Sequence, residues 1–81
     1  MLETIVEFLV KQLVEHPSSV RIVQKQEDGK IILTIHADEQ DLGKVIGKGG
    51  QTIRSIRSLA ILLNDQDGTQ ISVDVARDVA K

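Results

Sequence analysis

Residues 45–53 read Val45-Ile46-Gly47-Lys48-Gly49-Gly50-Gln51-Thr52-Ile53, and the organisation of the 81-residue chain follows from this stretch. Apolar residues lie before it at helical spacing, and a second apolar series follows it at the spacing of a longer helix. Glycine weakens a helix interior by about 1 kcal/mol relative to alanine, so the glycine cluster predicts a break between two helices. Glycine can also adopt positive φ and lie close to another molecule. We therefore expect a loop at the start of the second helix, where unpaired amide groups favour a phosphate.

The loop Gly47-Lys48-Gly49-Gly50, with isoleucines on both sides, resembles that of the KH family of single-stranded nucleic-acid binders. In KH domains a G-x-x-G loop clamps the backbone of about four nucleotides. The alternative is a plain corner between two helices that is closed by glycines. The flanking Ile46 and Ile53, together with the lysine inside the loop, favour the nucleic-acid interpretation.

Length and composition indicate one domain, predicted to span residues 1–81. A chain this short buries only a little over ~60% of its unfolded surface, so association would add stability. The sequence has no cysteine, which excludes a disulfide framework and a thiolate metal site. No apolar run reaches membrane-spanning length, and residues 1–4 lack the basic flank of a signal peptide. We expect a cytoplasmic protein that does not enter a membrane.

The formal net charge of −2 is low for a nucleic-acid binder, but the charges are distributed unevenly. Residues 42–63 contain no acidic side chain and four cations: Lys44, Lys48, Arg54 and Arg57. This segment predicts a single binding edge of modest affinity, because few phosphates can be neutralised. Phe8 is the only aromatic residue, which excludes an RRM-like or OB-like stacking platform.

Hydrophobic periodicity predicts six elements. The first is a helix of about a dozen residues from Leu2, with apolar positions at Leu2, Ile5, Val6, Leu9 and Leu13, and Pro17 is expected to end it. Strands are expected at 20–26, 31–37 and 71–75, the first two joined by an Asp28-Gly29 hairpin turn. The short helix before the loop begins near residue 42, with candidate N-caps in residues 38–41, and the long helix runs to about residue 63.

The order α-β-β-α-α-β predicts an α+β fold in which three helices cover one face of a three-stranded sheet. This is the order of the type II KH fold, and residues 2–75 resemble the KhpA family of short stand-alone bacterial KH proteins. Residues 13–17 (Leu-Val-Glu-His-Pro), 41–50 and 56–59 fit that family. The resemblance implies a homodimer, a heterodimer with a larger KhpB/Jag-type KH protein, and a post-transcriptional, RNA chaperone-like role that affects cell elongation and division.

We predict that single-stranded RNA contacts the two helices and the loop between them, with the third strand as the opposite wall. The predicted RNA-binding residues are Lys44, Val45, Ile46, Gly47, Lys48, Gly49, Gly50, Ile53, Arg54 and Arg57. Val45, Ile46 and Ile53 fit the floor of a groove or plain core equally well.

Other site chemistries fit the sequence poorly. Gly43-Lys44-Val45-Ile46-Gly47-Lys48 lacks the spacing and the Ser or Thr of a P-loop. His16 is interpreted as a helix-end residue and His36 as a solvated or packing residue on the polar face of the second strand. Neither has partners at metal-ligand spacing. We therefore predict no enzyme, no metal and no cofactor. The rival hypothesis is a dimerisation module in which RNA binding is incidental.

A helical wheel of the long helix places Ile53, Ile56, Leu59, Ala60 and Leu63 on its core stripe. Ile61 and Leu62 then point outward on either side. Large aliphatic residues on the outer surface of a helix in so small a domain predict a two-fold interface. We assign that interface to Ile61, Leu62, Arg54 and Ser58.

Overall fold

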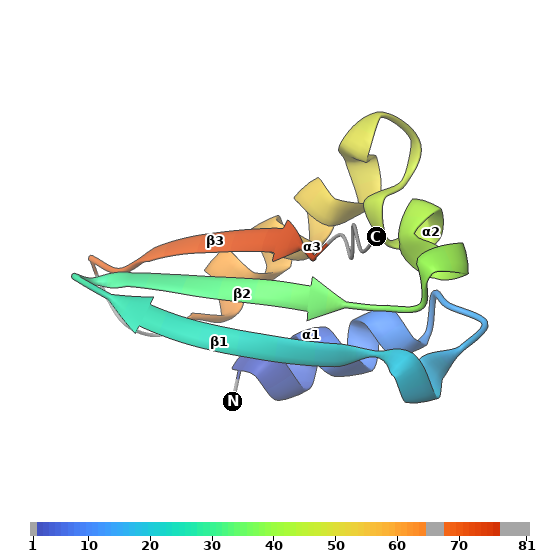
Figure 1. Cartoon of the computed structure of the whole chain (residues 1–81). Helices are drawn as coiled ribbons and strands as arrows, with labels where there is room; N and C mark the ends of the chain where they lie inside the picture. Colours follow the sequence, from blue (N-terminus) through green and yellow to red (C-terminus); the bar gives the residue numbers. More distant parts are fainter. Residues whose placement is uncertain (1, 65–67, 77–81) are drawn as a thin grey trace.

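The computed structural model describes residues 2–64 and 68–76, and the predicted domain also includes residues 1, 65–67 and 77–81, which lie outside the described residues (Figure 1). The predicted order of helices and strands is confirmed. The elements are α1 (Leu2–Lys11), η1 (Pro17–Ser19), β1 (Arg21–Glu27), β2 (Lys30–His36), η2 (Glu39–Asp41), α2 (Leu42–Ile46), η3 (Lys48–Gly50), α3 (Gln51–Leu63) and β3 (Gln70–Val75).

The three strands form one mixed sheet in the order β1-β2-β3. β1 and β2 are antiparallel, and the predicted hairpin turn between them places Asp28 and Gly29 at φ of 45° and 73°. Positive φ at both turn residues matches the right-handed twist of the strands. β3 lies parallel to β2, so the chain must cross the sheet between them. That crossover contains α2, the glycine loop and α3.

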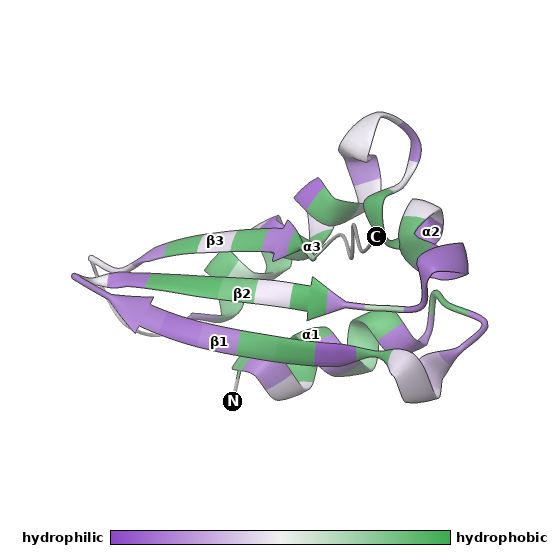
Figure 2. Ribbon diagram, viewed as in Figure 1, coloured by the Kyte–Doolittle hydropathy of each residue, from purple (hydrophilic) through white to green (hydrophobic). Residues whose placement is uncertain are grey.

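The core lies between the sheet and its helices. α1 and α3 cover the same face of the sheet, and α2 lies at the end of the sheet where β2 finishes (Figures 1 and 2). The central strand β2 buries alternate residues, as predicted. The buried apolar side chains are Val6, Val10, Val20, Ile31, Leu33, Ile35, Val45, Ile56, Ala60 and Val73.

The prediction that Pro17 ends the first helix is wrong. α1 stops at Lys11, and Pro17 instead begins the short 3-10 helix η1. Between them the backbone N–H groups of Glu15 and His16 donate to the carboxylate of Asp41, a partner far away in the sequence. Leu13, which the periodicity assigned to the core, follows the end of the helix and is exposed.

The predicted core stripe of α3 is too wide. Ile56 and Ala60 are buried and Ile53 is partly buried, but Leu59 is 41% exposed and Leu63 is 49% exposed. Ile56 and Ala60 are the buried residues of α3, so the helix packs on the core along a narrow stripe. The C-terminal half of α3 therefore presents four large aliphatic residues to the outside: Leu59, Ile61, Leu62 and Leu63.

Candidate nucleic-acid interface

The loop between α2 and α3 is built on three glycines with positive φ. Gly47 has φ 78° and ψ 169°, Gly49 has φ 64°, and Gly50 has φ 76°. At Gly47 a Cβ atom would lie 2.7 Å from the backbone nitrogen of Thr52, so this position has no room for a side chain. At Gly49 a Cβ atom would meet open space. The glycines therefore shape the loop in different ways: Gly47 permits close packing, and Gly49 keeps the outer surface bare.

The loop presents the amino-terminal end of α3. Gly50 is the N-cap residue of this helix and has no side chain to pair with the first amide groups. The N–H of Gly50 donates to the carbonyl of Gly47 at 3.1 Å, which closes the turn. The helix dipole places partial positive charge at this end, and Lys48 is exposed at the tip of the loop. Such an end suits an anion.

Arg54 holds the loop from the first turns of α3. Its Nη1 donates to the carbonyl oxygen of Gly49 at 2.7 Å. This contact brings a guanidinium beside the loop and fixes the peptide between Gly49 and Gly50. The prediction for Arg54 named RNA contact and the dimer interface, whereas the structure shows a further contact within the chain. Lys48, Arg54 and the three glycines are brought together at one end of the molecule.

Lys44 is engaged elsewhere. Its Nζ lies 2.7 Å from Glu15 and 3.9 Å from Asp41, on the side of α2 that faces the segment after α1. The hydrogen bond from Lys44 lowers the pKa of Glu15. A lysine with two carboxylate partners has less of its charge available to a phosphate, so Lys44 is the weakest of the predicted cations.

Asp41 is a buried carboxylate that joins the end of α1 to the start of α2. It is 1% exposed and accepts hydrogen bonds from the backbone N–H of Glu15 at 3.2 Å and of His16 at 3.0 Å. The ring Nδ1 of His16 lies 3.0 Å from the same carboxylate. Asp38, not Asp41, caps the following turn through its bond from the N–H of Gln40. Sequence reasoning recognised residues 38–41 only as candidate caps, because no local pattern indicates partners at Glu15 and His16.

The apolar residues of the predicted groove divide into two roles. Val45 is completely buried and belongs to the core, whereas Ile46 and Ile53 are only partly buried. Ile46 and Ile53 flank the loop and leave apolar surface beside it.

β3 is the edge strand beside α3, and both α2 and α3 contact it. The N–H groups of Gln70 and Ala76 donate to β2 and its flanking loop, at Gly29 and Ile35. In a parallel pair alternate residues bond to the neighbouring strand, so the peptide groups of Ile71, Val73 and Val75 point to the open edge.

The residues predicted for a dimer interface are all exposed. Ile61 is 53% exposed and Leu62 is 78% exposed, and Arg54 and Ser58 also face solvent on α3. Among residues 2–64 and 68–76 there is no cluster of three or more His, Asp or Glu side chains that could hold a metal. In the same part of the chain, every helix is too short or too polar to cross a bilayer.

Comparison with known proteins identifies similar chains. The sequence model of the KhpA/KhpB KH-domain family matches residues 3–75. An RNA-binding protein KhpA from Leifsonia xyli is 37% identical over 78 residues, which cover 96% of this chain and 100% of the relative. The KhpA proteins of Bacillus subtilis and Thermotoga maritima are 32% and 34% identical, covering 91% and 94% of this chain and 91% and 100% of theirs.

A crystal structure of Era from Aquifex aeolicus contains a similar fold, with a TM-score of 0.52 and 24% identity. The match covers 95% of this chain but only 31% of the Era chain. This likeness concerns the fold alone.

Proposed function

This chain belongs to the KhpA/KhpB KH-domain family, and on that premise we propose that it binds single-stranded RNA by clamping the RNA backbone at residues 47–50. The observation that carries the proposal is the glycine loop itself. Three positive-φ glycines and the exposed Lys48 surround the uncapped start of α3. A phosphate can approach the bare backbone there and meet both amide groups and a cation.

Arg54 supports the clamp in two ways. Its bond to the Gly49 carbonyl reduces the freedom of the loop before RNA arrives, which lowers the entropy lost on binding. It also adds positive charge beside Lys48. Since Lys44 is paired with carboxylates, we assign the main electrostatic contribution to Lys48, Arg54 and Arg57 and expect modest affinity.

The bases of the bound strand would lie between α3 and β3. Ile46 and Ile53 offer partly exposed apolar surface beside the loop, and the peptide groups of Ile71, Val73 and Val75 point outward from β3. An unpaired base needs both kinds of contact, apolar for its face and polar for its edge. We propose that the chain binds RNA and catalyses no reaction on it.

Exposed aliphatic residues on α3 favour a second activity, self-association. Leu59, Ile61, Leu62 and Leu63 are each at least 41% exposed on one helix. We propose a homodimer through this surface. From the family resemblance we also propose a heterodimer with a KhpB/Jag-type protein in the cytoplasm, acting after transcription on RNAs that affect cell elongation and division.

The clamp is tested by replacing Lys48 and Gly49 together with aspartate. Gly49 has open space around its Cβ position and lies near the left-handed region that Asp tolerates, so the fold should survive. Two carboxylates should repel phosphate and lower the affinity for a short single-stranded RNA about tenfold or more. Fluorescence anisotropy measures the affinity and circular dichroism the unfolding midpoint. Undiminished binding by the folded double variant would contradict the clamp.

The rival hypothesis, a scaffold with incidental RNA binding, predicts a different response to salt. Each phosphate neutralised in a single strand contributes a slope of about −0.7 on logarithmic axes. Three or four contacts give a slope of roughly −2 to −3. A flat response would favour the scaffold.

A further inference from the structure

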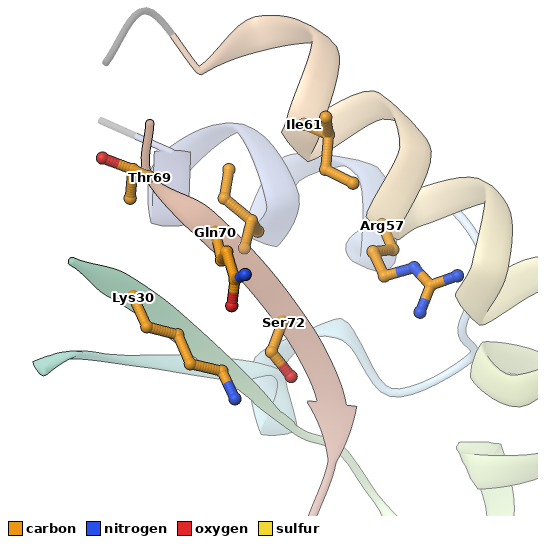
Figure 3. Close-up of a pocket in the computed structure, with 7 residues that line it drawn as sticks. Lys30, Arg57, Ile61, Thr69, Gln70 and Ser72 are labelled. Atoms are coloured by element: carbon orange, nitrogen blue, oxygen red, sulfur yellow. The ribbon is translucent and has the colours of Figure 1, made fainter. Parts of the chain in front are cut away.

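A shallow pocket lies between the C-terminal half of α3 and the start of β3, with a volume of about 420 Å³ (Figure 3). We name it the α3–β3 pocket. Arg57 and Ile61 line it from α3, Lys30 from the start of β2, and Thr69, Gln70, Ile71 and Ser72 from the β3 side. In Figure 3 the side chains of Lys30, Gln70 and Ser72 gather on the sheet side, opposite Ile61 and Arg57. Of these residues, Arg57 is predicted from the sequence to bind RNA, and Ile71 and Ser72 lie in the strand predicted to form the opposite wall of the groove.

The pocket is rich in hydrogen-bond donors. Its lining contains an arginine and a lysine, which only donate, and an amide and two hydroxyls, which do both. Among the described residues that line it there is no carboxylate, and in the same part of the chain neither Lys30 nor Arg57 forms an ion pair. Ile71 adds apolar surface. Ile61 is shared with the proposed dimer surface, so we assign the base to the part of the pocket formed by Arg57, Lys30, Gln70 and Ile71. A ligand that matches this lining has a flat apolar face and an edge rich in acceptors.

The pocket lies within reach of a strand held at the glycine loop. Arg57 is seven residues beyond Gly50 on α3, or about 10 Å at a rise of 1.5 Å per residue. At the 3.4 Å spacing of a stacked strand this distance corresponds to about three nucleotides. A strand clamped by its backbone at the loop can therefore place a base three nucleotides away at the pocket.

We infer that the α3–β3 pocket reads one base of the bound RNA and prefers the keto bases guanine and uracil to the amino bases adenine and cytosine; this rests on the proposed RNA binding. Guanine presents the acceptors N7 and O6 together, and uracil presents O4. Adenine and cytosine present an amino donor at the corresponding position, which would face the donors of Arg57 and Lys30. Guanine gains most, because Arg can donate to N7 and O6 at once.

The inference is tested with labelled octanucleotides, using an all-adenine strand and three strands that carry a single central G, U or C. The complete chain is titrated with each strand at one salt concentration, and dissociation constants are measured by anisotropy. We expect the G strand to bind about tenfold more tightly than the all-A strand, the U strand less so, and the C strand no better than the all-A strand. Equal affinities for the four strands would overturn the inference.

Variants locate the preference. Arg57→Ala, and separately Lys30→Ala, should reduce the G-over-A ratio toward one, while Lys25→Ala on the open face of the sheet should leave that ratio unchanged. Circular dichroism verifies that these exposed substitutions leave the fold intact. A G preference that survives both pocket variants would place base reading elsewhere and overturn the inference.

The double aspartate variant of the loop separates this inference from the proposed function. It should weaken binding to all four strands and preserve their ratios. If it leaves binding unchanged, the clamp fails, whatever the base preference shows. If it weakens binding while the wild-type chain shows no preference, the clamp stands and the pocket has no role in reading bases.

Discussion

A methyl group at Gly47 would meet the backbone nitrogen of Thr52 at 2.7 Å, and it would do so on a residue whose φ is 78°. The backbone of Thr52 cannot move away easily, because Thr52 belongs to the first turn of α3. Gly43, one helical turn earlier, has open space at its Cβ position and lies within α2. Alanine should therefore disturb the structure at position 47 but fit without a clash at position 43.

We expect Gly47→Ala to lower both the unfolding midpoint and the RNA affinity, the midpoint by about 4 °C or more if the strain costs at least 1 kcal/mol. Gly43→Ala is the matched control and should keep RNA binding while raising stability by up to about 1 kcal/mol. Thermal unfolding followed by circular dichroism measures the first quantity and anisotropy the second. Equal midpoints for the two variants would show that the loop tolerates a side chain at Gly47.

At the scale of elements, the contact between the end of α1 and the start of α2 depends on pH. The hydrogen bond between the ring of His16 and Asp41 raises the pKa of His16. Burial acts to raise the pKa of Asp41, but the bonds from Glu15 and His16 outweigh it and the pKa is lowered. Asp38, Glu15 and Lys44 are the other charged groups around this pair.

The directions of these two pKa shifts define the pH range in which the contact stabilises the fold. His16 stabilises the fold fully below its ordinary pKa of about 6.5, and this contribution is lost as the pH rises through the raised value. Asp41 contributes above its ordinary pKa of about 4, and this contribution is lost as the pH falls through the lowered value. The contact is therefore strongest between about pH 4 and pH 6.5.

We expect the thermal unfolding midpoint to decrease as the pH rises from about 6 to about 8. At the acid end of this pH range His16→Gln should be less stable than the wild-type chain. At the alkaline end the two proteins should have nearly the same stability. The comparison isolates His16, because His36 is present in both proteins. Parallel pH profiles for the two proteins would show that the pair contributes nothing.

How far the sequence predicts this structure depends on the range of the interaction. The alternation of Ile31, Leu33 and Ile35, the Asp28-Gly29 turn and the glycine loop were predicted correctly, because each depends on near neighbours in the sequence. The partners of Asp41 lie more than twenty residues away, so no local pattern could indicate them. The exposure of Leu59 and Leu63 likewise depends on how much of α3 the narrow sheet and α1 can cover.

At the scale of the whole molecule, the exposed surface of α3 is larger than the helical wheel predicts. Ile61 lies beside β3 at the α3–β3 pocket, Leu62 points outward, and Leu59 and Leu63 lie on the flank of α3 opposite Ile61. Burying one such side chain contributes about 1.5–3 kcal/mol, and a domain of this size has few other apolar residues to bury. A second copy of the chain, with its α3 packed antiparallel across a two-fold axis, would bury several of them at once.

The dimer prediction is tested by Ile61→Glu and Ile61→Tyr. Because Ile61 is 53% exposed, neither substitution should unfold the domain, but a charge or a larger ring at the seam should give a folded monomer. Leu62→Glu should have the same effect without altering the pocket, and Val23→Glu, on the open face of the sheet, should remain dimeric. Sedimentation and circular dichroism are measured together. If the Ile61 and Leu62 variants remain dimeric, the interface lies elsewhere; if they unfold, these side chains support the core instead of a partner.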